Sequence, residues 1–291
     1  MPKTGFAEAL GAHTVTMEIV ANDLRLHWRE AGAGRPLILL HPGPGLDGSI
    51  FFPFLEPLAE RHRLIALDLP GNGRSDQGGP DDWTLASCAD TVAAFADALG
   101  LREYTLLGHS FGSFVALTHL ARHPGAAARV VASCGAASET WLHTMSDRLA
   151  AFEPAALREQ VRQAFDRESR AQTPEDCRRV WADEMPFFVA DPQGDALERL
   201  TEALERVVFQ PAIYTTEGPD ETYDVRAELA HSHTPVLAIG GALDHSIPPE
   251  ASEEIARLAP HGTLAIIEGA GHFPFVETPA AYLNTLRDWL G

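Results

Sequence analysis

The sequence predicts an α/β protein built on a doubly wound, mostly parallel β-sheet with an inserted helical cap. Short apolar runs alternate with amphipathic stretches at helical spacing, which is typical of a parallel sheet covered on both faces. Between residues 139 and 230 such runs disappear, and charged residues and tryptophan recur instead. The apolar texture then resumes at 235–240. We therefore expect a core of residues 1–138 and 231–291 and a cap of residues 139–230.

The N-terminal half begins with alternating residues on either side of Asn22-Asp23, which predicts a hairpin of strands 15–20 and 24–29. A short helix is expected at 51–60, although two prolines within it oppose helix formation. Continuous apolar runs predict buried strands, and apolar residues at 3.6-residue spacing predict helices. The other elements expected in this half are strands 37–40, 64–67, 104–107 and 130–133 and helices 84–99 and 111–123.

The C-terminal half contains the expected cap and the remainder of the core. Prolines interrupt the helix-like segments of the cap, so we expect several helices and no buried strand there. Strands and helices then alternate again to the end of the chain. The expected cap helices are 146–171, 175–184 and 195–208, followed by strand 235–240, helix 249–259, strand 263–267 and helix 275–290.

Length and composition limit the classes of function. A chain of 291 residues suits one large α/β domain or one domain with an insertion. Its net charge of −19 argues against nucleic acids and anionic membranes as partners. The three cysteines, Cys88, Cys134 and Cys177, are widely spaced and form neither a disulfide framework nor a zinc motif. No signal peptide or membrane-spanning run is apparent, so we expect a cytoplasmic protein.

The pattern Gly108-x-Ser110-x-Gly112 lies between a predicted strand and a predicted helix. A strand that turns sharply into a helix leaves little space, and the two glycines allow the backbones to approach. The serine then occupies the apex of the turn, with its hydroxyl projecting from the carboxyl end of the strand. The amide of Phe111 begins the helix and points to where an oxyanion could form. This pattern predicts a nucleophilic serine.

A serine hydroxyl needs a base within hydrogen-bond reach and a third group that orients the base. Asp244 follows strand 235–240, and His272 follows strand 263–267. Loops at the carboxyl ends of parallel strands meet at one edge of the sheet. We therefore predict a catalytic triad of Ser110, Asp244 and His272.

Other polar residues are weaker candidates for the triad or for a metal site. Asp220 and Asp224 do not follow apolar strands, so they are weaker rivals of Asp244. His231 and His233 could bind a metal, but no third ligand is apparent. We therefore predict neither a metal nor a cofactor. His109, inside the elbow, is expected to pack.

The loop after strand 37–40 is expected to supply the second oxyanion donor. Pro42 and Pro44 have no N–H group, so among residues 42–44 only Gly43 can donate. Gly45 is the alternative donor. The predicted oxyanion hole therefore consists of the amides of Gly43 and Phe111.

Together these motifs resemble the α/β-hydrolase family over essentially the whole chain. The His41-to-Gly45 loop is similar to the His-Gly-Gly-Pro-Gly loop of proline iminopeptidases, with Pro42 in place of one glycine. The segment ending at Glu221 is similar to a Gly-Pro-Asn-Glu segment whose glutamate holds the ammonium group of the substrate in some of those enzymes. This resemblance implies that Glu221 binds substrate. A second glutamate expected after the catalytic aspartate is replaced here by His245.

The sequence therefore predicts a serine hydrolase that acts through an acyl-enzyme on a small-molecule or short-peptide substrate. One hypothesis is a proline iminopeptidase-like aminopeptidase. A second is a carboxylesterase or lactonase for a small apolar acyl group, which would need no ammonium site. A third is a non-catalytic binding protein of the same fold, which the complete triad disfavours. The oligomeric state is open.

Overall fold

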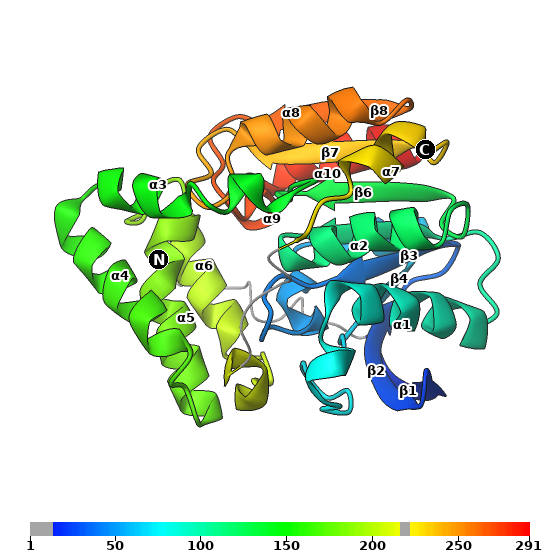
Figure 1. Ribbon diagram of the computed structural model, residues 1–291, viewed down its shortest axis with the longest axis horizontal. Coiled ribbons are helices and arrows are strands. Elements are labelled where there is room, and N and C mark those ends of the chain that lie inside the picture. Colours follow the sequence, from blue (N-terminus) through cyan, green and yellow to red (C-terminus); the bar gives the residue numbers. More distant parts are fainter. Residues whose placement is uncertain (1–13, 216–221) are drawn as a thin grey trace, which may run out of the picture.

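The computed structural model describes residues 14–215 and 222–291. An eight-stranded sheet of order β1-β2-β4-β3-β5-β6-β7-β8 forms its centre (Figure 1). β2 pairs antiparallel with β1 and β4, and the other neighbours are parallel, so the predicted mostly parallel sheet is confirmed. The strands are β1 (Val15–Ala21), β2 (Leu24–Ala31), β3 (Arg35–Leu40), β4 (His62–Leu67), β5 (Thr105–His109), β6 (Arg129–Ser133), β7 (Val236–Gly241) and β8 (Gly262–Ile267).

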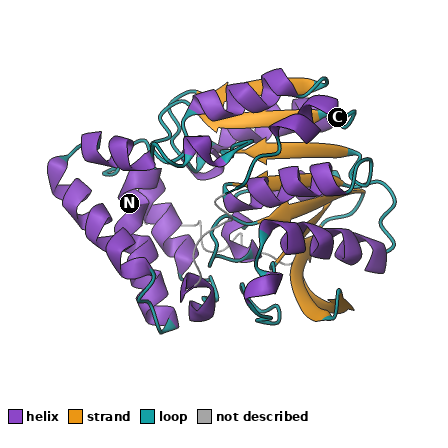
Figure 2. Cartoon of the chain, viewed as in Figure 1, coloured by secondary structure: helices purple, strands orange, loops and turns teal. Residues whose placement is uncertain are grey.

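Alternate side chains of the central strands enter two separate apolar cores, one on each face of the sheet. In β3, Leu37 and Leu39 belong to one core, whereas Ile38 and Leu40 belong to the other. This two-sided burial explains why these strands appear in the sequence as continuous apolar runs. Figure 2 shows helices on both faces. One core is covered by α1 (Leu85–Ala98), α2 (Phe111–Arg122), α7 (Arg226–His231) and α8 (Pro249–Leu258), and the other by α9 (Pro274–Glu277) and α10 (Pro279–Leu290).

Prolines explain where the observed helices differ from the expected ones. The helix expected at 51–60 is replaced by two short 3₁₀ helices, Gly48–Phe51 and Glu56–Glu60. The helix expected at 275–290 is divided at Pro279, which begins α10. A proline lacks the N–H group that a continuous helix needs and restricts the residue before it.

Among the described residues, four helices, α3 to α6, occupy most of the region expected to be the cap (Figure 1). The chain leaves and re-enters the core at one place, because Glu139 N donates to Tyr223 O (2.9 Å) and Val225 N donates to Ala137 O (2.9 Å). The expected single stretch 146–171 is two helices separated near Pro154. The helices are α3 (Met145–Ala151), α4 (Ala155–Glu168), α5 (Pro174–Phe188) and α6 (Asp195–Leu204).

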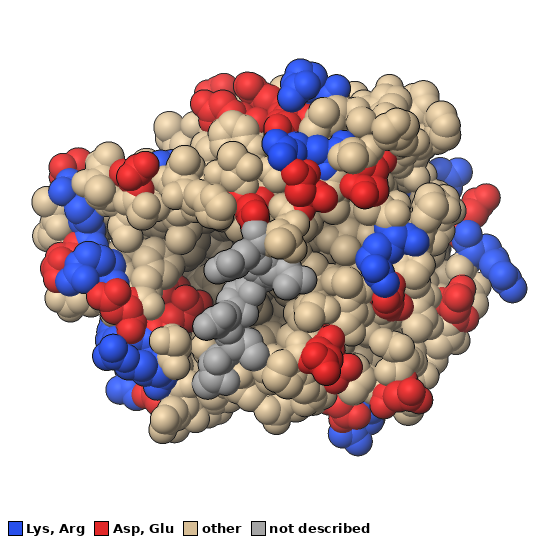
Figure 3. All heavy atoms as spheres, viewed as in Figure 1, with Lys and Arg blue, Asp and Glu red and all other residues tan. Residues whose placement is uncertain are grey.

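Acidic and basic side chains are interspersed on the surface of these helices (Figure 3). Arg162 of α4 contacts Glu159 and Asp166, and Arg167 contacts Asp183 of α5. Such exposed pairs contribute only about 0.2–1 kcal/mol each, so they indicate a solvated face. None of the described helices is both long and apolar enough to cross a membrane.

Candidate active site

Ser110 sits at a strained turn between β5 and α2. Its backbone angles are φ 53° and ψ −119°, in a region that residues with side chains rarely adopt. A Cβ at Gly108 would overlap the carbonyl oxygen of Gly112, and one at Gly112 would overlap the carbonyl oxygen of Leu40. The two glycines therefore permit the close contact of β5, α2 and β3 that holds the serine in place.

His272 and Asp244 form a buried pair at the carboxyl ends of β8 and β7. His272 Nδ1 lies 2.7 Å from Asp244 Oδ2. The other carboxylate oxygen accepts hydrogen bonds from the amides of Ser246 (2.8 Å) and Ile247 (3.0 Å). The carboxylate is thereby fixed, and it accepts the Nδ1–H of the imidazole. This tautomer leaves Nε2 available as a base.

Ser110 and His272 line the same cavity, which has a volume of about 210 Å³. Among the described residues, no hydrogen bond joins the two side chains. Catalytic hydrogen bonds often tighten only when substrate binds. The structure therefore brings the three predicted residues to one site and joins two of them directly, and the triad itself stays a prediction.

The two predicted oxyanion donors are free in the described part of the chain. Neither the Gly43 nor the Phe111 amide donates to a protein partner there, and both residues line the cavity. Gly43 has φ 138°, which favours glycine. The alternative donor, Gly45, already donates its N–H to Asn72 Oδ1 at 2.6 Å. Of the two glycines considered, Gly43 is therefore the better candidate.

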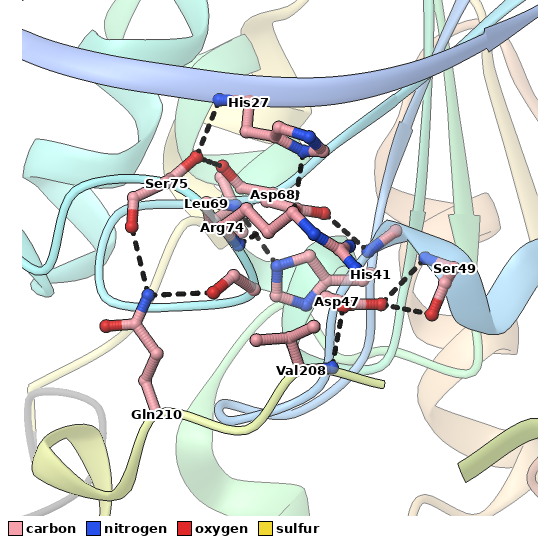
Figure 4. Close-up of polar contacts among 12 residues, drawn as sticks. His27, His41, Asp47, Ser49, Asp68, Leu69, Arg74, Ser75, Val208 and Gln210 are labelled. Atoms are coloured by element: carbon pink, nitrogen blue, oxygen red, sulfur yellow. Dashed lines mark hydrogen bonds and ion pairs between the residues drawn. The ribbon is translucent and has the colours of Figure 1, made fainter. Parts of the chain in front are cut away.

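A buried histidine, His41, orients the peptide that carries the Gly43 amide, and its contact with Leu69 is drawn in Figure 4. His41 Nδ1 lies 2.8 Å from Pro42 O, and the Leu69 amide donates to His41 Nε2 at 3.2 Å. Because Nε2 accepts, Nδ1 must carry the proton and donate it to the carbonyl. Burial lowers the pKa of His41, in agreement with this neutral form. In the trans peptide between residues 42 and 43, the Gly43 N–H points away from the held carbonyl.

Two buried aspartates lie beside this histidine (Figure 4). Burial alone would raise the pKa of Asp68, but hydrogen bonds from His27 and from the amides of Arg74 and Gly48 outweigh it and lower the pKa. Burial and then the charge of Asp68 raise the pKa of Asp47.

Asp47 also connects the core to the segment that returns from the cap helices. Its carboxylate accepts from the Val208 amide at 2.9 Å as well as from the amide and hydroxyl of Ser49. In the same segment, Gln210 donates to the carbonyl oxygens of Gly73 and Ser75, both at 2.9 Å (Figure 4). The His41-to-Gly45 loop and the returning segment are thus fastened to one buried network.

The walls of the cavity are mostly apolar, and they include a buried carboxyl group, that of Glu184. Glu184 of α5 is only 2% exposed, and its Oε1 has no hydrogen-bond partner among the described residues. Burial, followed by the charge of Glu168, raises the pKa of Glu184 well above its ordinary value. Both glutamates line the cavity that contains Ser110. Sequence reasoning missed Glu184, because a glutamate within a charged helix gives no local signal of burial.

Arg148 of α3 was also missed and holds the loop that carries Asp244. Its guanidinium donates to the carbonyl oxygens of His245 (2.7 Å) and Ser246 (2.5 Å). Burial lowers the pKa of Arg148, while Asp244 acts in the opposite direction. A helix of the cap region thus supports the residue that orients the imidazole.

Asp224 and His231, two weaker sequence candidates, do not join the site. Asp224 pairs with Arg226 near the surface (2.5 Å). His231 Nδ1 lies 2.7 Å from the Ala227 carbonyl oxygen. Glu221 and Asp220 lie outside the described residues.

Among the described residues, Cys134, Asp244 and His272 form a group that could in principle bind a metal ion. Their possible ligand atoms all lie within 4.8 Å of one another. The facing His272 and Asp244 atoms already bond to each other. Burial raises the pKa of the Cys134 thiol well above its ordinary value, which disfavours the thiolate that binds metals. We therefore interpret Cys134 as a packing residue behind the His272–Asp244 pair and the group as no metal site.

A larger cavity, of about 630 Å³, lies elsewhere. Ala127 and Ala128 precede β6, and Thr234 and Pro235 precede β7, so this cavity is at the amino ends of the strands. The predicted catalytic side chains lie at the opposite ends. The smaller cavity is therefore the candidate active site.

A family model described as an alpha/beta hydrolase fold matches residues 35–279. The chain belongs to the α/β-hydrolase family. A pimeloyl-[acyl-carrier protein] methyl ester esterase of Edwardsiella ictaluri is 32% identical over 91% of this chain and 96% of its own length. A proline iminopeptidase of Heyndrickxia coagulans is 26% identical over 90% of this chain and 92% of its own.

Solved structures agree with the fold. An alpha/beta fold family hydrolase from Bacillus anthracis str. Sterne has a TM-score of 0.78 at 21% identity, covering 95% of this chain and 99% of that chain. Because its relatives include both esterases and peptidases, this α/β-hydrolase is a hydrolytic enzyme whose substrate the family alone does not determine.

Proposed function

We propose that this α/β-hydrolase is a serine hydrolase that works through an acyl-enzyme. The observation that carries the proposal is the buried His272–Asp244 pair, whose histidine lines the same cavity as the strained Ser110. His272 would take the proton of the Ser110 hydroxyl, and Asp244 would stabilise the resulting imidazolium. The amides of Gly43 and Phe111 would bind the oxyanion. The imidazolium would then give that proton to the departing amine or alcohol, and water activated by the neutral His272 would release the acyl group as a carboxylic acid.

We further propose that the substrate carries a protonated amine close to the scissile bond, as an N-terminal residue of a short peptide does. The support is the unpartnered Oε1 of Glu184, with Glu168 beside the same cavity. A buried carboxylate without a partner costs about 1–3 kcal/mol or more, and an ammonium group would offset that cost. Glu221 would be a further contributor by its resemblance to proline iminopeptidases.

A neutral ester of an apolar acyl group is the second candidate. Phe114, Phe165, Trp181 and Phe188 line the cavity, and an esterase is among the relatives. If Glu184 is protonated, it would donate a hydrogen bond to a neutral substrate. The two candidates therefore differ in the charge of Glu184 when substrate is bound.

Ser110→Ala tests the shared mechanism. Without the nucleophile, turnover of prolyl, alanyl and short-acyl ester substrates should fall by roughly 10³-fold or more. The free energy of unfolding should be nearly unchanged. Hydrolysis rates and circular dichroism of the two proteins check this. A variant that keeps wild-type turnover on the preferred substrate refutes the serine mechanism.

Glu184→Gln distinguishes the two substrate classes. Loss of a carboxylate–ammonium contact should lower kcat/KM for prolyl and alanyl amides by about 10–100-fold, corresponding to roughly 1.5–3 kcal/mol, and affect neutral esters much less. Glu253→Gln, an exposed glutamate on α8, is the matched control. Equal losses on charged and neutral substrates would favour the ester assignment over the amine assignment.

A further inference from the structure

Three consecutive backbone amides at His272 are all held by partners outside the loop itself. Gly271 N donates to Glu277 Oε2 at 3.0 Å, and Phe273 N donates to Glu277 Oε1 at 2.9 Å. Between them, His272 N donates to the carbonyl oxygen of Phe188 at 2.6 Å. The carboxylate of Glu277 therefore grips the backbone immediately before and after the predicted base.

The same carboxylate reaches across to the end of α5. Ala190 N donates to Glu277 Oε2 at 2.7 Å. A Cβ at Gly271 would lie 2.7 Å from Ala190 N and 2.8 Å from Phe188 O, so the loop and residues 188–190 are in direct backbone contact. Glycine at position 271 permits this approach. The position of the His272 loop is thus set partly by a helix of the cap region.

We propose that Glu277 is a positioning residue, which aligns His272 with Ser110 and couples that alignment to residues 188–190. The inference rests on the serine-hydrolase function proposed above. Glu277 does not itself line the cavity, and its hydrogen bonds among the described residues all come from backbone amides, so it acts through the backbone on either side of His272.

The chemistry of the side chain explains why a carboxylate is needed. Glu277 accepts three amide N–H groups, and a carboxylate is an acceptor at both oxygens. Glutamine has the same length, but its NH₂ group would face at least one N–H donor. Burial raises the pKa of Glu277, and its three hydrogen bonds act in the opposite direction.

The link also runs to the substrate cavity. α5 carries Trp181, Glu184 and Phe188, all of which line that cavity. Phe188 additionally lies against the His272 ring, with ring centroids 5.4 Å apart. A displacement of residues 188–190 would therefore reach the His272 loop through Glu277.

The test compares full-length Glu277→Gln and Glu277→Asp with the exposed control Glu253→Gln. A misplacement of about 1 Å at a catalytic group can cost roughly 10²-fold, so we expect kcat to fall by about 10–100-fold with KM changed less than about threefold. The far-downfield proton resonance of the His272–Asp244 hydrogen bond should shift or broaden in the Glu277 variants. The control should retain the wild-type kcat and resonance.

Wild-type kcat and an unshifted resonance in a folded Glu277→Gln protein would overturn the positioning role, whereas an inactive Ser110→Ala would still support the hydrolase mechanism. Loss of the mechanism itself would appear instead as an active Ser110→Ala protein. If only Glu277→Gln misfolds, kcat and the downfield resonance of Glu277→Asp decide the question. Aspartate keeps the charge, but its shorter side chain cannot accept hydrogen bonds from all three amides. If neither variant folds, the role is structural and the proposal is rejected.

Discussion

At the scale of single residues, Glu184 combines burial with an unsatisfied carboxyl group beside the predicted nucleophile. Residues that lower the stability of the folded protein are commonly retained at sites where binding or catalysis requires them. A glutamate that supports the backbone is expected to have hydrogen-bond partners, as Glu277 has. The two glutamates therefore differ in what they do: Glu277, which is partly buried, holds backbone amides, and the buried Glu184 lines the cavity.

Glu184→Gln is predicted to stabilise the protein, increasingly so as pH rises. The folded-state pKa of Glu184 is raised, so the folded protein binds this proton more tightly than the unfolded chain does. The contribution of Glu184 to the unfolding free energy of the wild-type protein is therefore lost as pH rises from the ordinary glutamate pKa through the folded-state pKa. Urea unfolding of wild type and variant between about pH 5 and about pH 8 should show a growing gap of about 1–3 kcal/mol. A gap that shrinks with rising pH would contradict the prediction.

Residues on loops after strands could be predicted from sequence, whereas supporting residues on helices could not. Ser110, Asp244 and His272 each follow an apolar run, and that context made them recognisable. Glu184 and Arg148 lie on charged helices whose polar residues all look alike in sequence. Only tertiary packing determines which of them faces the cavity or the Asp244 loop.

At the scale of elements, the turn from β5 into α2 depends on the absence of two side chains. Gly112→Ala would place a methyl group against the Leu40 carbonyl oxygen, which is backbone and cannot rotate away. We expect a destabilisation of about 1–3 kcal/mol or more, together with reduced turnover because the Phe111 amide moves with the helix.

Thermal unfolding and hydrolysis rates check this expectation. Gly79→Ala is the matched control, since a Cβ there meets nothing within 4 Å and the position has no positive φ. A Gly112→Ala protein as stable as the control would show that α2 can move freely from β3.

The strands of the core were predicted closely, because two-sided burial leaves a continuous apolar signal. Helix ends were predicted less well. At 51–60 the two prolines noted in the sequence prevent a continuous helix, and at 275–290 the prediction did not allow for the interruption at Pro279. Helix α7 falls within the stretch assigned to the cap, yet Leu229 packs in the apolar core shared with α1, α2 and α8.

At the scale of the whole molecule, the fold was predictable but the placement of the cap helices on the core was not. Alternating strands and helices indicate a doubly wound sheet through simple packing rules. The contacts that dock the cap region run from Asp47 to Val208, from Arg148 to the Asp244 loop, and from Ala190 to Glu277. None has a sequence signal, and the boundaries 139–230 stay a prediction.

Asp47→Asn is predicted to loosen this docking. An asparagine keeps one carbonyl oxygen, but its NH₂ group would oppose the Val208 amide or the Ser49 amide, so one buried donor loses its acceptor. We expect a loss of about 1–3 kcal/mol in unfolding free energy, measured by urea denaturation. Asp97→Asn, at an exposed position on α1, is the control. An equal, small effect in both variants would mean that the Val208 contact contributes little.

The backbone pairing of Ala137 and Glu139 with Tyr223 and Val225 brings the two ends of the inserted stretch together. An insertion whose ends already meet can be lengthened, shortened or exchanged while the sheet keeps its shape. In this chain such an exchange meets a second constraint, because residues 188–190 also hold the loop that carries His272. A replacement for the inserted stretch would have to reproduce the contacts of residues 188–190 as well as the pairing of its two ends. Otherwise His272, the predicted base, would be misaligned with the new pocket.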